Sequence, residues 1–184
     1  MPKVALFDLD GTLADYNGQM ASDLHSIESP DELSILPSFG DKHPEYLENR
    51  RQMISRQFGW WESLPRIEYV FDLYYYLFAK GYCVNIATKG PSTKSHAWAE
   101  KLNWCRANTP EANVTITEDK SLLYGKILVD DYPGYAEKWL EYRPRGLVVM
   151  PEYNYNKGFD HPQVVKFNSG NLEKVKERIN ELVR

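Results

Sequence analysis

The segment VALFDLD, residues 4–10, constrains the fold of this chain more than any other stretch. Its first four residues are all apolar, which is typical of a strand buried on both faces of a parallel sheet. Five more apolar runs predict further strands, over residues 82–90, 113–117, 126–131, 146–150 and 163–167. Because segments with helical spacing separate several of these runs, we predict an α/β fold with a doubly wound, mostly parallel, Rossmann-like sheet.

Five segments carry the apolar spacing of amphipathic helices. The clearest lies within residues 64–82, where Gly81 occupies the position of a C-terminal cap. The others cover about residues 18–27, 43–58, 91–105 and 171–183. Ser92 is a candidate N-cap for the helix of residues 91–105, and residues 150–162 have the composition of a loop.

Residues 15–64 differ from the rest of the chain because they are polar and are interrupted by Ser-Pro, Leu-Pro and His-Pro pairs. We predict that they form a small helical cap, inserted after the first strand. Residues 1–14 and 65–184 would then form the α/β core domain. A length of 184 residues suits one domain with such an insertion.

Charge and cysteine content narrow the functional classes. The net charge of −4 argues against stable nucleic-acid binding, and it means that an anionic substrate needs a metal ion or local lysines. The two cysteines do not form a metal-type pair, and Cys83 is expected to be a buried free thiol. No apolar run approaches the length of a membrane span, and no leader-like segment opens the chain, so we expect a cytoplasmic protein.

Polar residues follow the predicted strands at their carboxyl ends. Since these ends meet at one edge of a parallel sheet, the residues should converge there. They are Asp8 and Asp10, Thr88 and Lys89, Glu118, Asp119 and Lys120, and Asp130 and Asp131.

Such a cluster has a defined chemistry. Crowded carboxylates repel one another unless a cation or protons intervene, and oxygen ligands without histidine or cysteine suit Mg²⁺. A carboxylate can also act as a nucleophile and form an aspartyl-phosphate. The i, i+2 spacing of Asp8 and Asp10 turns both side chains the same way, and Gly11 permits a turn that frees backbone N–H groups for phosphate.

The motif DLDGT after an apolar strand resembles the first motif of the haloacid dehalogenase (HAD) superfamily of phosphohydrolases. Thr88, Lys120 and the pair Asp130-Asp131 follow in the order of that superfamily's other motifs. The segments DGTLADY, GWWESLP, IATKGP and ITEDKSLLYGKILVDD further resemble the 5′(3′)-deoxyribonucleotidases, over roughly residues 3–131. Lys89 and Glu118 depart from that family, which has serine and arginine there, and this leaves the substrate preference open.

The resemblance implies a role for each motif residue. Asp8 would be the nucleophile, and Asp10 would protonate the leaving oxygen and then activate water. Thr88 would hydrogen-bond the phosphate, and Lys120 would balance charge; Lys126 competes for this last role, but its spacing to Asp130 fits the motif less well. The implied Mg²⁺ ligands are Asp8, Asp10 through its main-chain carbonyl, Asp130, and Asp131 as a further or alternate ligand.

Within the resemblance, three aromatic residues are what point to a nucleotide as the substrate. Tyr16, Trp60 and Trp61 match the family's aromatic positions, where a nucleobase could stack; the alternative is packing between cap and core. Lys89 either adds charge at the phosphate or is only solvated.

The resemblance thus implies a Mg²⁺-dependent phosphomonoesterase that acts on (deoxy)nucleoside monophosphates, a 5′-nucleotidase of the deoxyribonucleotidase type. One alternative is a HAD phosphatase for another small phosphoester, such as a sugar phosphate. Others are a phosphatase for nucleic-acid ends and a non-catalytic binding protein. The expected partner is a small-molecule phosphoester. No association with a membrane is expected, and a homodimer is possible.

Overall fold

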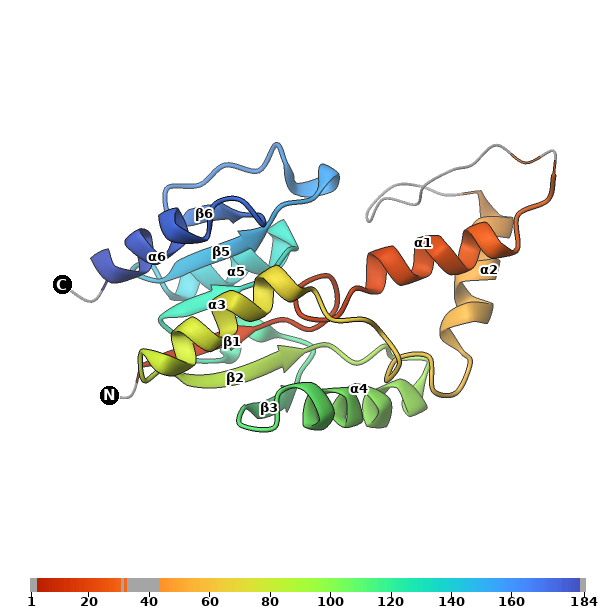
Figure 1. Cartoon of the computed structure of the whole chain (residues 1–184), viewed down its shortest axis with the longest axis horizontal. Coiled ribbons are helices and arrows are strands. Elements are labelled where there is room, and N and C mark those ends of the chain that lie inside the picture. The colour runs from red at the N-terminus through yellow and green to blue at the C-terminus, as the bar shows by residue number, and fades with distance from the viewer. Residues whose placement is uncertain (1–2, 31, 33–43, 183–184) are drawn as a thin grey trace.

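The computed structural model describes residues 3–30, 32 and 44–182. In this part of the chain six parallel strands form one sheet, in the order β3-β2-β1-β4-β5-β6 (Figure 1). They are β1 (Val4–Phe7), β2 (Cys83–Thr88), β3 (Asn113–Ile116), β4 (Ile127–Val129), β5 (Leu147–Pro151) and β6 (Val164–Phe167). The strand order reverses between β1 and β4, and their carboxyl ends therefore form the crevice in which sheets of this kind bind ligands.

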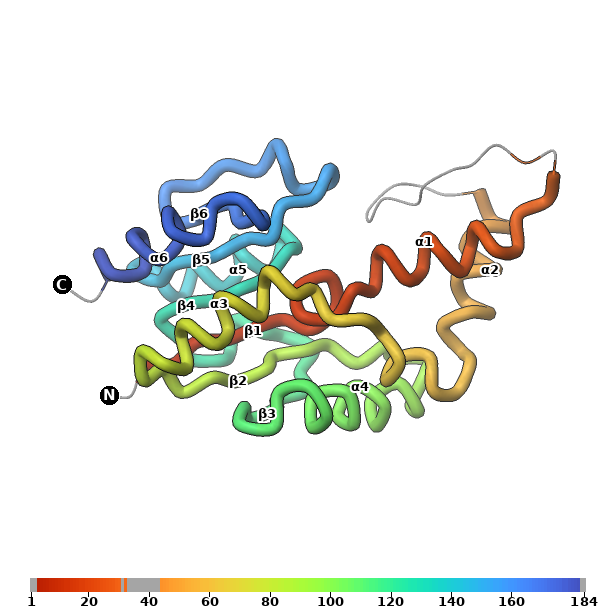
Figure 2. Tube along the Cα trace, viewed as in Figure 1, coloured from red at the N-terminus to blue at the C-terminus, as the bar shows by residue number. Residues whose placement is uncertain are grey.

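Helices cover both faces of the sheet, as a doubly wound fold requires (Figure 2). They are α1 (Tyr16–Ser26), α2 (Glu45–Ser55), α3 (Glu68–Ala79), α4 (Ser95–Asn108), α5 (Pro133–Tyr142) and α6 (Leu172–Glu181). Phe7 belongs to a hydrophobic cluster with α3, α4 and α6, whereas Leu6 belongs to a second cluster with α5. Successive residues of β1 are thus buried on opposite faces, which explains its continuous apolar sequence and confirms the predicted fold class.

Helices α1 and α2 lie beyond the carboxyl ends of the strands (Figure 1). The carboxylate of Asp15 accepts a hydrogen bond from the Gly18 amide at 2.9 Å and begins α1. Met20 on α1 and Ile54 on α2 are buried in the same cluster as α3. The division of the chain into a cap of residues 15–64 and a core stays a prediction.

One local prediction about a helix was wrong, and one helix was not predicted. Helix α4 begins at Ser95, and Lys94 rather than Ser92 occupies its N-cap position, without a side-chain cap. Helix α5 had not been predicted, although Pro133 stands in its first turn and the apolar residues Ala136, Trp139 and Leu140 have helical spacing. The predicted loop of residues 150–162 contains the short 3₁₀ turn η2 (Asn154–Asn156).

Other local expectations have mixed outcomes. Gly81 adopts a positive φ of +75° after α3, as the cap prediction requires. Cys83 is exposed, so its predicted burial was wrong, and Cys105 is the buried thiol. Residues 43 and 183, which were assigned to helices, lie outside the described residues. Among the described helices, none combines the length and the apolar character needed to cross a bilayer.

Candidate active site

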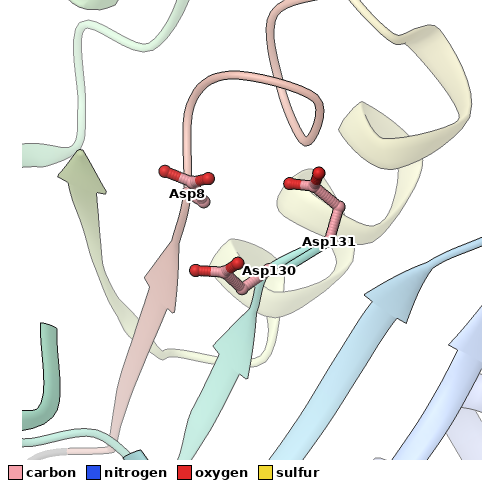
Figure 3. A group of neighbouring side chains, drawn as sticks. All are labelled: Asp8, Asp130 and Asp131. Carbon is pink, nitrogen blue, oxygen red and sulfur yellow. The ribbon is translucent and has the colours of Figure 1, made fainter. Parts of the chain in front are cut away.

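Three carboxylates from two neighbouring strands meet at the crevice between β1 and β4. Asp8 follows β1, and Asp130 and Asp131 follow β4; Figure 3 shows their side chains grouped together. The register aligns Phe7 with Val129, which places Asp8 beside Asp130. One oxygen atom from each of the three carboxylates lies within 4.8 Å of the others, and all three residues are buried.

Lys120 supplies the positive charge inside this acidic group. It lies on the 3₁₀ turn η1 (Lys120–Leu122), and its side chain is only 2% exposed. Its Nζ lies 2.6 Å from Asp8 Oδ1 and 2.8 Å from Asp130 Oδ2. Burial by itself would lower the pKa of Lys120, but the charges of Asp130 and Asp8 outweigh burial and raise it. Lys126, the alternative considered from the sequence, precedes β4 and therefore lies at the opposite edge of the sheet.

Burial shapes the acidity of the two aspartates after β4. It raises the pKa of Asp130, and the Lys120 charge opposes that rise. It also raises the pKa of Asp131, where the charges of Asp8 and Asp130 add to the effect. Without a cation, these two carboxyl groups therefore hold protons more tightly than ordinary aspartates do.

Asp10 has a different cationic partner from Asp8. Its carboxylate is ion-paired with the ammonium group of Lys101, on α4, whose side chain is 2% exposed. Burial raises the pKa of Asp10, while the charge of Lys101 acts in the opposite direction. Each aspartate of the DLDGT motif is thus paired with its own lysine.

Sequence reasoning missed Lys101, although the sequence contains a signal. Lys101 lies four residues from Ala97 and four from Cys105, both of which are buried on the inner side of α4. A lysine in the middle of a buried helical stripe requires an acidic partner inside the protein. Its Nζ also donates to the carbonyl of Lys89 at 2.7 Å and to Thr88 Oγ1 at 3.4 Å.

A cavity of about 220 Å³ opens beside the carboxylates. Three aspartates and two lysines line it: Asp8, Asp10, Asp131, Lys101 and Lys120. The segment assigned to the cap contributes Tyr16, Asn17 and Trp61. The loops after β2 and β4 and the start of α5 contribute Lys89, Gly90, Pro91, Tyr132 and Tyr135. Of the residues predicted to contact substrate, Tyr16, Trp61 and Lys89 thus border this space. Thr88, by contrast, is fully buried behind Lys101.

Trp60 is not among the residues that line this cavity, and its predicted contact with substrate stays a prediction. Its indole donates to Asp23 Oδ2 at 2.7 Å, and its ring contacts Tyr16 edge-on at 5.4 Å between centroids. Trp61 stacks on Tyr16 at 5.5 Å, and Lys101 Nζ lies 4.7 Å from the centre of the Trp61 ring. Trp60 therefore packs inside the segment assigned to the cap, whereas Trp61 serves both packing and the cavity wall.

The donor set fits a hard divalent cation. Asp8, Asp130 and Asp131 offer oxygen atoms alone, and their mutual repulsion would be relieved by a positive ion. Asp8 also faces the cavity, and Lys120 at its side holds the orientation of its carboxylate. Such an arrangement can accept an anionic group and present a carboxylate to it.

Comparisons with known proteins agree with this chemistry. The family model described as 5′ nucleotidase, deoxy (pyrimidine), cytosolic type C protein (NT5C) matches residues 2–168. A search of curated proteins found no match to the chain.

Solved structures show the fold. A haloacid dehalogenase-like family hydrolase from Xanthomonas campestris is similar over 100% of this chain and 98% of its own, with a TM-score of 0.59 and 15% identity. A HAD family hydrolase from Deinococcus radiodurans with bound phosphate and sodium covers 99% and 96%, with a TM-score of 0.61 and 14% identity. The HAD-hydrolase YfnB from Bacillus subtilis, bound to magnesium, covers 97% and 99%, with a TM-score of 0.52 and 14% identity.

Proposed function

We propose a specific reaction for this chain, which belongs to the family of 5′-nucleotidase, deoxy (pyrimidine), cytosolic type C proteins and is a phosphoric monoester hydrolase. The proposed reaction is the Mg²⁺-dependent dephosphorylation of (deoxy)nucleoside monophosphates through an aspartyl-phosphate on Asp8. The observation that carries it is the position of Asp8, which borders the cavity while Lys120 Nζ holds its Oδ1 at 2.6 Å.

The metal site of this proposal consists of Asp8, Asp130 and Asp131, with the main-chain carbonyl of Asp10 as a further ligand. A bound Mg²⁺ supplies positive charge that offsets the negative charge of the phosphate and of the carboxylates. Among the structural relatives, one holds magnesium and another holds phosphate and sodium, which supports a site for a cation and an anion.

The covalent steps use two aspartates. A carboxylate oxygen of Asp8 attacks phosphorus, the bond from phosphorus to the leaving oxygen breaks, and Asp10 gives that oxygen a proton. Asp10 then takes a proton from a water molecule, whose oxygen attacks phosphorus and releases inorganic phosphate from Asp8. The raised pKa of Asp10 suits the first of these proton transfers. Lys89, which borders the cavity just after β2, is proposed to contact the phosphate oxygens. Thr88, whose side chain is buried behind Lys101, could reach them only if Lys101 moves aside, and its predicted phosphate contact stays a proposal.

Tyr16 and Trp61 are proposed to contact the nucleobase, because both rings border the cavity and stack on each other. Trp60 is proposed to hold the Tyr16 ring in place through its edge-on contact with that ring. The position of α1 and α2 beyond the strand ends supports a cap of residues 15–64 over the site (Figure 1). The family description, cytosolic type C, supports a cytoplasmic location.

One observation favours a second candidate substrate. The cavity of about 220 Å³ is smaller than the roughly 300–1,000 Å³ of common ligand pockets, and a sugar phosphate would need less room than a nucleotide.

A panel of phosphoesters separates these substrates. Phosphate release is measured with Mg²⁺, and in parallel with a chelator, for deoxynucleoside 5′- and 3′-monophosphates, ribonucleotides and sugar phosphates. We expect the highest kcat/KM for a nucleoside monophosphate and no release with the chelator. Equal rates for sugar phosphates would refute the nucleotide preference alone, and full activity with the chelator would refute the metal requirement.

A further inference from the structure

The segment between β5 and β6, whose sequence marked only a loop, reaches the acidic cluster. The hydroxyl of Tyr155 donates a hydrogen bond to Asp131 Oδ2. On the other side, Thr12 Oγ1 donates to Asp131 Oδ1 at 3.0 Å. Each oxygen of the Asp131 carboxylate therefore accepts a hydrogen bond from a hydroxyl group, and the plane of this carboxylate is set by two segments far apart in sequence.

A buried asparagine holds this loop in place. The Asn156 side chain, which is fully buried, donates to the carbonyl of Asp131 at 2.7 Å and to that of Pro151 at 2.8 Å. Its Oδ1 accepts from the Tyr153 amide at 3.0 Å, and Lys166 on β6 donates to its main-chain carbonyl. Tyr155 is thus anchored next to Asp131 through the adjacent residue of the chain.

Tyr153 connects the same loop to the first motif. Its ring stacks on Tyr155, with centroids 5.3 Å apart and planes within 7°, and its hydroxyl donates to the carbonyl of Gly11 at 2.8 Å. Gly11 has a φ of +77°, and a Cβ atom there would lie 2.7 Å from Asp131 Oδ2. The backbone after β1 therefore passes close to Asp131, and only glycine fits there without strain.

These contacts leave Asp131 able to bind a cation. A carboxylate has about four lone-pair positions, so one hydroxyl donor at each oxygen leaves others for a metal ion. Asp131 lies next to the like charges of Asp8 and Asp130, which would otherwise favour its rotation away from them. Groups that hold a metal ligand in its orientation are commonly worth 10–100-fold in metal affinity.

We propose that Tyr155 is a positioning residue that orients the Asp131 carboxylate for Mg²⁺, with Thr12 as the second donor. This inference rests on the proposed metal site and adds a determinant of metal affinity from the loop between β5 and β6. Tyr155 acts through Asp131 and has no part in the covalent steps.

Calorimetric titration with Mg²⁺ alone tests the proposal on the full chain, for the wild type and for Tyr155→Phe, Tyr153→Phe and Tyr76→Phe. Tyr155→Phe should raise the Kd for Mg²⁺ by about 10-fold or more, and kcat should recover when Mg²⁺ is raised to saturation. Tyr153→Phe, which loses a contact with main-chain Gly11 instead, should raise it less. Tyr76→Phe is the matched control, because its hydroxyl contacts Asn180 at 3.1 Å, between α3 and α6.

Thermal unfolding in the absence of metal shows whether each variant folds normally. An unchanged Kd in Tyr155→Phe, with normal binding by the wild type, would overturn the role of Tyr155 and leave the proposed function intact. If Tyr153→Phe and Tyr155→Phe lost the same Mg²⁺ affinity and both had lower unfolding temperatures, the loop would only stabilise the fold by packing, and Tyr155 would not be a positioning residue. A wild type that binds no Mg²⁺ would overturn both proposals.

Discussion

The ammonium group of Lys101 is ion-paired with the carboxylate of Asp10, and 91 residues of sequence separate the two. The same ammonium group donates to the carbonyl of Lys89 at 2.7 Å and lies 4.7 Å from the centre of the Trp61 ring. One buried lysine therefore contacts the proposed acid–base group, the end of β2 and the aromatic wall of the cavity.

Lys101→Met should lower kcat by at least about tenfold, a part of the roughly 10²–10⁴ that general acid–base catalysis contributes. The reason is that Asp10 would lose the partner that orients it. Lys101→Arg keeps the charge and should retain more activity than the methionine variant. Arg106→Met, an exposed substitution on the same helix, is the control for steady-state kinetics. Equal activity in Lys101→Met and the wild type would contradict this role.

Asp8→Asn should lower kcat by at least about a thousandfold, because a neutral amide is too weak a nucleophile to form the acyl phosphate. The fold should persist, since asparagine can still accept from Lys120 and one of three crowded negative charges is removed. Single-turnover assays measure the loss, and circular dichroism with thermal unfolding measures the fold. Asp160→Asn, on the exposed surface, serves as the control. Near-normal turnover in Asp8→Asn would rule out the proposed nucleophile.

Trp61→Leu should raise the KM for a nucleoside monophosphate about tenfold, as expected from the roughly 1–3 kcal/mol of base stacking on an aromatic ring. The KM for β-glycerophosphate, which has no base, should change much less on the same variant, so any loss of stability cancels in the comparison. Trp60→Phe removes the donor to Asp23, and it should cost about 1 kcal/mol of stability with little change in KM. A parallel rise for both substrates would assign Trp61 to packing alone.

The metal-free protein should become less stable as the pH rises above about 4. In the unfolded chain Asp131 ionises near its ordinary pKa of 3.8, whereas burial raises the folded pKa. Between about pH 4 and the folded pKa of about 8, the unfolded state therefore binds fewer protons than the folded state, and the free energy of unfolding falls with pH.

Calorimetry in a chelator at a series of pH values measures this slope. Because the proposed Mg²⁺ would bind the ionised carboxylates, its addition should raise the unfolding temperature more at pH 8 than at pH 6. Asp131→Asn should flatten the slope of the metal-free protein. A slope that is the same in both proteins would show that Asp131 does not titrate as described.

Local patterns were sufficient to predict most of the alternation of strands and helices and the order of the motif residues. The spacing of apolar residues and the position of turn residues depend only on neighbouring positions in the chain. They are enough to predict that Val4–Phe7 forms a strand and that Asp8 follows it. The prediction of Ser92 as an N-cap failed because the start of α4 depends on which backbone turn the chain takes. Helix α5 was missed although Pro133 and the helical spacing of Ala136, Trp139 and Leu140 indicate it.

By itself, the sequence determined the fold class, the family, and the position of Asp8 and Asp10 after a buried strand. Tertiary structure alone decided that Lys101 pairs with Asp10, that Tyr155 binds Asp131, and that Trp61 borders the cavity while Trp60 does not. The physical reason is distance along the chain. Such contacts arise from strand register and loop placement, and a linear pattern carries no measure of either.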